Sequence, residues 1–262
     1  MHLSEKQIKD YKNFGVIIVK DAFKDWIDPL RAGFKKVLDK PSKHGRENVA
    51  NNEGRFFEDY CNWERIKEFK DCIYNSQATK IFTEATSSKS SQIFHEHIFI
   101  KEAGTHKETP WHQDMPYYCV SGNDTGSFWI PLDNVDKENN LQLILGSHKW
   151  PKLVRPTKWS NDQSWYSGDS SFMDLPNIGD FKNDILIPEL NLGDAVLFNF
   201  KIVHGSSGNK TSNSRRAFSM RFIGDDVKYI NRGGPTSPPF DGINLKTGDM
   251  MREDWFPKIF NG

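Results

Sequence analysis

Apolar and polar positions repeat along the chain with two periods, helical in the first third and strand-like afterwards. Near the start, Ser4 followed by Gln7 has the form of a capping box, which opens a helix. Apolar residues then recur at helical spacing until Gly15, which is expected to end the helix. The β-branched run from Val16 to Val19 predicts a strand directly after it.

Three more helices are predicted in the first third of the chain. Asp28-Pro29 forms an N-cap and first-turn pair, and apolar residues follow it at helical spacing. Two further helices are expected around 63–74 and 77–86. The stretch 41–58 carries Pro, Gly, Asn and charged residues without a period, so it is predicted to be a loop.

After Ser91, short strand-like runs separated by turn residues replace the helical pattern. The predicted strands are Ile93–Lys101, Trp111–Asp114, Ser127–Leu132, Leu141–Leu145, Ala195–Phe200 and Ala217–Ile223. Helices first and many short strands later predict an α+β chain that is mainly β. Its core is expected to be a double-stranded β-helix (jelly roll, cupin-like), with the N-terminal helices packed on one sheet.

A single domain of residues 1–262 is expected, because no stretch has the composition of a linker. Its predicted parts are an N-terminal helical part of about 1–90, a jelly-roll part of about 91–225 and a C-terminal tail of 226–262. The polar stretch of about 151–186 interrupts the strands. Such a long insertion in a compact domain is usually functional or mobile, so it is predicted to be a lid.

The charge balance and cysteine content narrow the class of protein. Lys+Arg and Asp+Glu are both 35, and this balance argues against a protein that binds nucleic acid or an anionic membrane. Cys61, Cys72 and Cys119 lack metal-type spacing and are expected to be reduced thiols. No run of 18 apolar residues exists and no signal segment is evident, so a cytoplasmic protein is expected. Its expected partner is a small-molecule substrate, and its expected oligomeric state is a monomer or a homodimer.

The motif TPWHQDMPYY at 109–118 is the most informative segment for chemistry. If it is a strand, His112 and Asp114 project to the same face, because side chains two residues apart do so. An imidazole beside a carboxylate makes two-thirds of a facial triad, which holds iron(II) and leaves half of its coordination sites open. Read alone, His-x-Asp is a weak signal, since a surface or buried polar pair has the same pattern.

Two later segments strengthen the interpretation. His204 ends an apolar run that follows the turn at Gly193-Asp194, which is typical of a strand end facing a pocket. Arg215 comes after a Gly/Ser/Asn/Lys-rich turn that lets the next strand return alongside, where an arginine can bind a carboxylate with two hydrogen bonds. A hydrogen-bonded structural histidine and a surface arginine are the alternatives for these two residues taken singly.

The sequence resembles the phytanoyl-CoA dioxygenase family of iron(II)/2-oxoglutarate oxygenases. The resemblance rests on WHQDMPYY, on LGSHKW at 145–150, on GDAVLF followed by VHGSSGNKTSNSRRAFS, and more loosely on the opening segment. It implies three metal ligands, which are His112, Asp114 and His204. It also implies four residues that contact the 2-oxoglutarate co-substrate, which are Arg215, Ser206, Trp129 and, less securely aligned, His95.

The resemblance further implies that the chain binds Fe(II), 2-oxoglutarate and O2, and hydroxylates a small-molecule metabolite with release of succinate and CO2. Related halogenases lack the carboxylate ligand, so Asp114 favours hydroxylation over halogenation. The sequence has no basic cluster or phosphate-binding loop for a CoA group, which favours a small free metabolite as substrate.

Two other functions are left open by the residues. One is a catalytically silent jelly-roll protein that binds a metabolite, and the other is a cupin-type metal isomerase or hydrolase, which would not require Arg215. Lys101 and Arg221 would suit an anionic substrate if they faced inward, although solvated strand positions are the ordinary expectation for both. His97 shares a predicted strand face with His95 and so could approach the same pocket.

Overall fold

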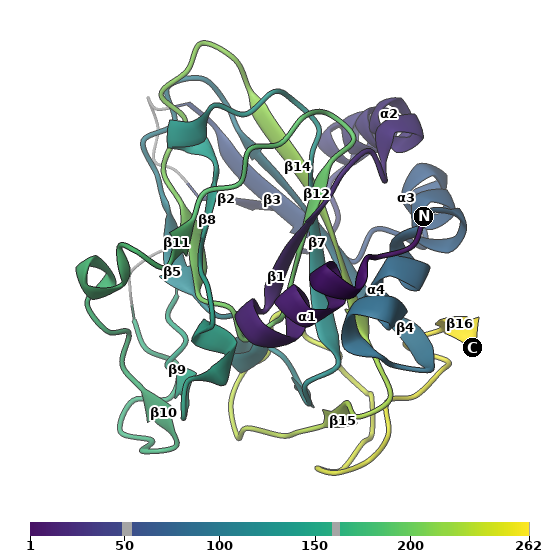
Figure 1. The fold of residues 1–262 in the computed structure, drawn as a ribbon, viewed down its shortest axis with the longest axis vertical. Coiled ribbons are helices and arrows are strands. Elements are labelled where there is room, and N and C mark those ends of the chain that lie inside the picture. The colour runs from purple at the N-terminus through teal and green to yellow at the C-terminus, as the bar shows by residue number, and fades with distance from the viewer. Residues whose placement is uncertain (49–53, 159–162, 262) are drawn as a thin grey trace.

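Two antiparallel sheets form the core of the molecule, and helices cover the outer side of the larger one (Figure 1). The computed structural model describes residues 1–48, 54–158 and 163–261, so parts of the predicted loop and lid lie outside the described residues. The larger sheet has the order β1 (Val16–Val19), β12 (Ala195–Phe198), β7 (Thr125–Pro131), β14 (Arg215–Ile223), β4 (Ser90–Lys101), β3 (Phe56–Tyr60) and β2 (Arg46–Glu47), with β16 (Lys258–Asn261) also paired to β4. The smaller sheet has the order β11 (Ile185–Leu186), β8 (Leu141–Ile144), β13 (His204–Ser206) and β5 (Thr109–His112). Together with the comparisons below, these sheets confirm the predicted jelly roll.

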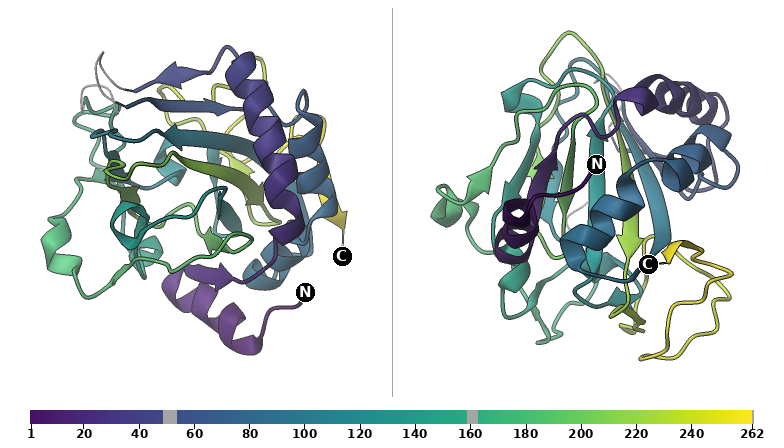
Figure 2. Two further views of the ribbon diagram at one scale, coloured as in Figure 1. Left: turned by 90° about the horizontal axis from the view of Figure 1, so that it is seen from above. Right: turned by 45° about the vertical axis from the view of Figure 1, so that its right-hand side comes forward.

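The four predicted helices are present. They are α1 (Glu5–Phe14), α2 (Ile27–Asp39), α3 (Lys67–Asn75) and α4 (Ala78–Thr86), and Figure 2 shows α2, α3 and α4 on one side of the larger sheet. The capping box of α1 is confirmed, and the helix ends at Gly15, whose φ is +74°. The predicted N-cap at Asp28 is wrong: α2 begins at Ile27 after a 3-10 turn, so Asp28 lies in its first turn.

The predicted loop at 41–58 is wrong at both of its described ends, where β2 and β3 form. Phe56 and Phe57 are 1% and 2% exposed, and β3 pairs with β4 in the register Tyr60↔His97. A strand that gains its stability from a distant partner carries little local signal, because strand propensity depends on the surroundings more than helix propensity does. The pairing nevertheless places one face of β3 beside the candidate site.

The two faces of the larger sheet carry different residues. On β14, Phe218, Met220 and Phe222 belong to the apolar core beneath the helices, where Phe218 and Phe69 of α3 have ring centroids 4.7 Å apart. The alternate residues of β14 turn the other way and line a cavity between the sheets: Arg215, Ala217, Ser219 and Arg221. Alternation along one strand therefore separates the helix-covered core from a partly polar cavity.

The predicted lid and tail are built from short elements. Within the insertion, β9 (Leu153–Val154) pairs with β10 (Phe172–Met173), and Thr157, Lys158 and Trp165 line the cavity. In the tail, β15 (Lys228–Tyr229) pairs with β6 (Val120–Ser121). The insertion thus covers part of the cavity, while its opening and closing stay a prediction. Among the described residues, no helix is both long and apolar enough to cross a bilayer.

Candidate metal centre

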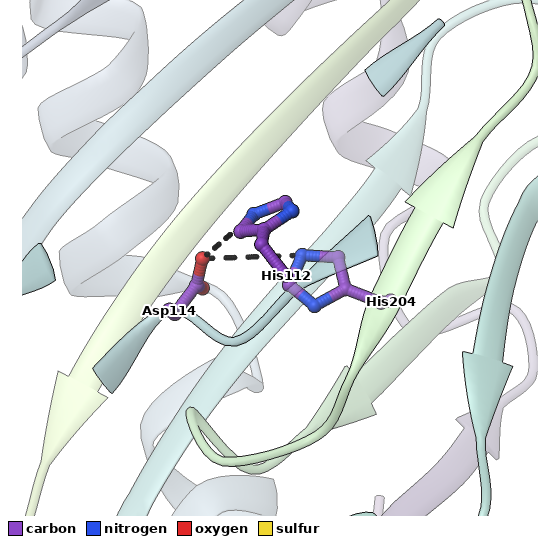
Figure 3. A group of neighbouring side chains, drawn as sticks. All are labelled: His112, Asp114 and His204. Atoms are coloured by element: carbon purple, nitrogen blue, oxygen red, sulfur yellow. Dashed lines mark ion pairs between the residues drawn. The ribbon is translucent and has the colours of Figure 1, made fainter. Parts of the chain in front are cut away.

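A cavity of about 380 Å³ lies between the sheets and contains the residues of the sequence motifs. His112, Asp114 and His204 meet inside it, with ligand atoms that all lie within 4.8 Å of one another. Nε2 of His112 is 3.6 Å from Oδ1 of Asp114, and Nε2 of His204 is 3.9 Å from the same oxygen (Figure 3). All three residues are buried, so the motifs converge on one group of metal-ligand type.

The backbone fixes the orientation of both imidazoles. Nδ1 of His112 is 2.7 Å from the carbonyl of Pro110, and Nδ1 of His204 is 3.0 Å from that of Ile202. Because a carbonyl oxygen only accepts, each Nδ1 carries the proton and donates it. Each ring therefore turns Nε2 toward Asp114, in the tautomer that binds a metal through Nε2.

Asp114 does not lie on a strand, so the predicted strand Trp111–Asp114 is wrong at its end. β5 stops at His112, and Asp114 has helical dihedral angles (φ −70°, ψ −44°) at the start of a 3-10 turn over Met115–Tyr117. Pro116 lies within this turn, where it has no amide hydrogen to donate to a strand. Asp114 still reaches His112, because the turn brings its side chain back toward the cavity.

Two neighbours bind the second oxygen of Asp114. Ser127 Oγ donates to Oδ2 at 3.0 Å, and Arg221 Nε donates to the same atom at 3.3 Å. Arg221 is 3% exposed, which corrects the expectation of a solvated strand residue, and its guanidinium lies over the ring of Tyr118. Oδ2 is thus held by protein donors, while Oδ1 faces both histidines.

Protonation at this site suits metal binding. Burial would raise the pKa of Asp114, but the charge of Arg221 and the hydrogen bond with His112 outweigh it and hold the pKa well below its ordinary value. Burial lowers the pKa of His204 to about 3, so its ring is neutral near pH 7. A carboxylate and a neutral imidazole are the forms of these residues that bind metal ions.

A second charged group lies at one end of the same cavity. Arg215 and Lys101 are direct partners across β14 and β4, and both donate to Ser206 Oγ, at 3.2 and 3.3 Å. Lys101 is 1% exposed, so the expectation of a solvated lysine is wrong. Burial, followed by the charge of Arg215, holds the pKa of Lys101 well below its ordinary value. Two buried cations side by side favour an anion between or beside them.

The other residues singled out from the sequence also line the cavity. Trp129, on β7, pairs with Ser219 of β14 and is 7% exposed. His95 lies opposite Arg221 in the β4–β14 ladder, six residues from Lys101 along β4. His95 is therefore on the Arg221 side of the cavity, away from the two cations, and its contact with the co-substrate stays a prediction.

Sequence reasoning missed Ser127 and Glu58, and it expected Lys101 to be solvated. Each belongs to a strand whose pairing, rather than its local composition, turns the side chain inward. The alternation of β4 was the available signal, because it places Lys101 on the same face as His95 and His97. Glu58 gave no such signal, since its segment was predicted to be a loop.

The sequence is similar to a known family of dioxygenases over most of its length. The model of the phytanoyl-CoA dioxygenase (PhyH) family matches residues 11–217. The peroxisomal phytanoyl-CoA dioxygenase of Rattus norvegicus is 25% identical over 251 residues, covering 88% of this chain and 72% of the rat protein. The phytanoyl-CoA dioxygenase domain-containing protein 1 homolog of Dictyostelium discoideum is 24% identical over 269 residues, with 88% and 94% covered.

Solved structures share the fold. The non-heme alpha ketoglutarate dependent carbocyclase SnoK from nogalamycin biosynthesis gives a TM-score of 0.77 at 17% identity, covering 98% of this chain and 96% of that one. EctD from S. alaskensis with 2-oxoglutarate and 5-hydroxyectoine gives 0.65 at 16% identity, with 85% and 76% covered. These likenesses concern the fold alone, whereas the family model extends over most of the sequence. The chain therefore belongs to the phytanoyl-CoA dioxygenase family and is an oxygenase.

Proposed function

We propose that this protein is an Fe(II)- and 2-oxoglutarate-dependent dioxygenase in which His112, Asp114 and His204 hold the metal. The observation that carries the proposal is the presence, in one cavity, of a buried His-Asp-His group and of two buried cations, Arg215 and Lys101. Among the described residues, neither cation forms a salt bridge with a carboxylate. The cavity therefore combines a metal-ligand set with a site for an anion.

The donor set fits iron(II). Two imidazole nitrogens and one carboxylate oxygen on one side are the facial arrangement of non-haem iron oxygenases, which leaves positions for a chelating co-substrate and O2. Asp114 offers one oxygen to the metal, because Ser127 and Arg221 hold the other. The backbone carbonyls that orient the two imidazoles supply the supporting contacts that such ligands require.

The cation pair fits the far carboxylate of 2-oxoglutarate. Ser206 follows His204 by two residues on β13, which corresponds to about 7 Å along a strand. Arg215 and Lys101 both contact Ser206, so they lie about the length of a short dicarboxylate from the metal ligands. We assign the anchoring of the far carboxylate to Arg215, with Lys101 and Ser206 beside it and Trp129 and His95 as further cavity residues.

When bound, iron and 2-oxoglutarate together supply oxidation of a C–H bond by O2, coupled to decarboxylation to succinate. The chain's own part is to orient and to exclude water. Arg215 holds one end of the co-substrate, and Asp114 and the histidines fix the other. Phe198, Trp129 and Tyr117 line the cavity and limit the access of water to the reacting atoms. We propose hydroxylation of a small-molecule metabolite in the cytoplasm as the reaction.

The test is an anaerobic titration with Fe(II) and 2-oxoglutarate, which should produce a weak visible charge-transfer band, followed by succinate formation on admitting O2. In Arg215→Ala, the 2-oxoglutarate concentration needed for the band should rise by about tenfold or more, because a charge-assisted contact is lost. Arg216→Ala is the matched control, since Arg216 pairs with Asp133 at 2.6 Å.

The proposal fails if the wild-type protein gives neither the band nor oxygen-dependent succinate. Asp114→Ala should abolish succinate formation by weakening iron binding, and undiminished turnover in that variant would refute the ligand assignment. If Arg216→Ala weakened 2-oxoglutarate binding while Arg215→Ala did not, the anchoring role would belong to the neighbouring arginine.

A further inference from the structure

A second polar cluster lines the cavity on the β3 and β4 side, and the metal and co-substrate groups do not use it. Its centre is Glu58, which accepts a hydrogen bond from Nε2 of His97 at 3.0 Å. Beside them, the Tyr60 hydroxyl accepts from Nη2 of Arg46 at 3.2 Å. The cluster sits in the cavity wall because Glu58 and Tyr60 share one face of β3, next to Phe99 and His97 of β4.

Glu58 is an ionised carboxylate in the cavity wall, and an imidazole is its ion-pair partner. It is 5% exposed, and its ion-pair partner among the described residues is the imidazole of His97 rather than a lysine or arginine. Burial raises the pKa of Glu58, but the hydrogen bond with His97, followed by smaller contributions from Asn48 and Arg46, outweighs it and holds the pKa below its ordinary value. A buried carboxylate in a cavity wall is stabilised by further hydrogen-bond donors, which a bound molecule can provide.

The cluster lies to one side of the β14 residues that line the cavity, which suits the recognition of a substrate. In the larger sheet, β3 is separated from β14 by β4, so Glu58 lies about 10 Å, or two strand spacings, to one side of the β14 residues. Across the sheet, Ala217 of β14 lies in line with Glu58 of β3, and Ser219 lies in line with Tyr60. Both of these β14 residues are small. They leave room above β14, and a ligand that extends to the cluster would pass over Phe99 and His97 of β4.

We propose that Glu58 and His97 form the subsite that recognises hydroxyl groups of the primary substrate, which is therefore a small hydroxylated molecule. This inference rests on the proposed oxygenase function and adds a substrate class to it. A substrate hydroxyl donates to Glu58, and Tyr60 and Arg46 offer further polar contacts at the same wall. The carbon that is oxidised then lies at the other end of the molecule, toward His112, Asp114 and His204.

A hydroxyl group and an ammonium group can both donate a hydrogen bond to Glu58, and the charge of the cavity favours the hydroxyl group. Among the described residues that line the cavity, five are lysine or arginine, against two carboxylates, Glu58 and Asp114. An added cation is repelled by this excess and by the metal, whereas a neutral hydroxyl donates to Glu58 without that penalty. An acyl chain would leave the carboxylate without donors, so it fits this wall poorly.

The experiment measures succinate formation by the iron-loaded protein with four groups of compounds: neutral polyols and sugars, hydroxy acids, amines, and fatty acyl compounds. Hydroxylated compounds should raise succinate formation above the rate without added compound. In Glu58→Gln the KM for the stimulating compound should rise by about tenfold or more, because a hydrogen bond to a charged group is lost. The charge-transfer band with 2-oxoglutarate should be unchanged in that variant.

The matched control is Glu96→Gln. Glu96 is equally buried, but it lies on the opposite face of β4 and accepts from the backbone N–H groups of Asn62 and Trp63. It should keep the wild-type KM, which separates recognition by Glu58 from a general effect of changing a buried carboxyl group on the same sheet. Circular dichroism and thermal unfolding of both variants establish that they are folded.

Several results would overturn the subsite. An unchanged KM in a folded Glu58→Gln variant, or an equal rise in Glu96→Gln, removes the assigned role from Glu58. Stimulation by amines or acyl compounds alone, or by none of the compounds, overturns the substrate class. Failure of the proposed function is a separate result, because it appears in the wild-type protein as a missing charge-transfer band before any substrate is added.

Discussion

At the scale of single residues, the two hydrogen bonds on Oδ2 of Asp114 determine how this carboxylate meets a metal. Ser127 and Arg221 both donate to that atom, and Oδ1 lies toward His112 and His204. Such supporting contacts typically contribute a factor of 10 to 100 in metal affinity. We therefore expect Ser127→Ala and Arg221→Met each to weaken metal binding, with the double variant weaker still.

The measurement is an anaerobic calorimetric titration with Fe(II), which needs no substrate and no turnover. Arg216→Met is the control, because its guanidinium pairs with Asp133 and does not line the cavity. Unchanged affinity in Ser127→Ala and Arg221→Met would mean that Asp114 holds its position without them. Tighter binding in Arg221→Met would mean that the charge of Arg221 opposes the metal more than its hydrogen bond helps.

The sequence alone allowed site residues to be predicted where a polar residue type stands out from the segment around it. His112, Asp114 and His204 stand in apolar or motif-rich segments, and the structure brings their side chains together. Lys101 and Arg221 could not be predicted as buried, because a charged residue on a strand has the same local pattern whether it faces solvent or a cavity. Their burial arises only when β14 pairs with β4 and β7.

At the scale of elements, the packing of α2 against α3 depends on one glycine. A Cβ at Gly33 would lie 2.6 Å from Cε1 of Phe69, and Phe69 is fully buried. Alanine improves helix propensity by up to about 1 kcal/mol, but overpacking in a core costs about 1–3 kcal/mol. Gly33→Ala should therefore lower the free energy of unfolding by about 1–2 kcal/mol in urea denaturation.

Lys35→Ala is the control on the same helix, since Lys35 is exposed and should change stability by less than about 0.5 kcal/mol. A Gly33→Ala protein as stable as the wild type would show that α2 can move away from α3 without loss of packing. Helix α2 itself was predictable from its apolar spacing. Strands β2 and β3 were not, because they are stabilised by a distant strand.

At the scale of the whole molecule, Glu96 links stability to pH. Burial, only partly offset by the N–H groups of Asn62 and Trp63, raises its pKa from the ordinary 4.5 to about 8. Between these values the folded protein keeps a proton that the unfolded chain has released. The contribution of Glu96 to stability therefore falls as pH rises from 4.5 to about 8, and it is constant above that.

Glu96→Gln has no proton to lose at this position. The free energy of unfolding of the variant minus that of the wild type should therefore increase between pH 4.5 and pH 8, by more than about 1 kcal/mol. Urea unfolding at several pH values measures this difference, and other titrating groups cancel in it. A difference that stays constant with pH would mean that Glu96 is ionised in the folded protein throughout the window.

The pairing of β1 with β12 has a consequence for the time course of folding. These two strands come from distant parts of the sequence, yet Val16 lies opposite Phe198 at one border of the larger sheet. Bringing such distant segments together requires a large loss of chain entropy before any contact compensates for it, which slows folding relative to proteins of local topology. During synthesis β1 leaves the ribosome long before β12, so its apolar side chains and backbone groups lack this partner strand until β12 has been made.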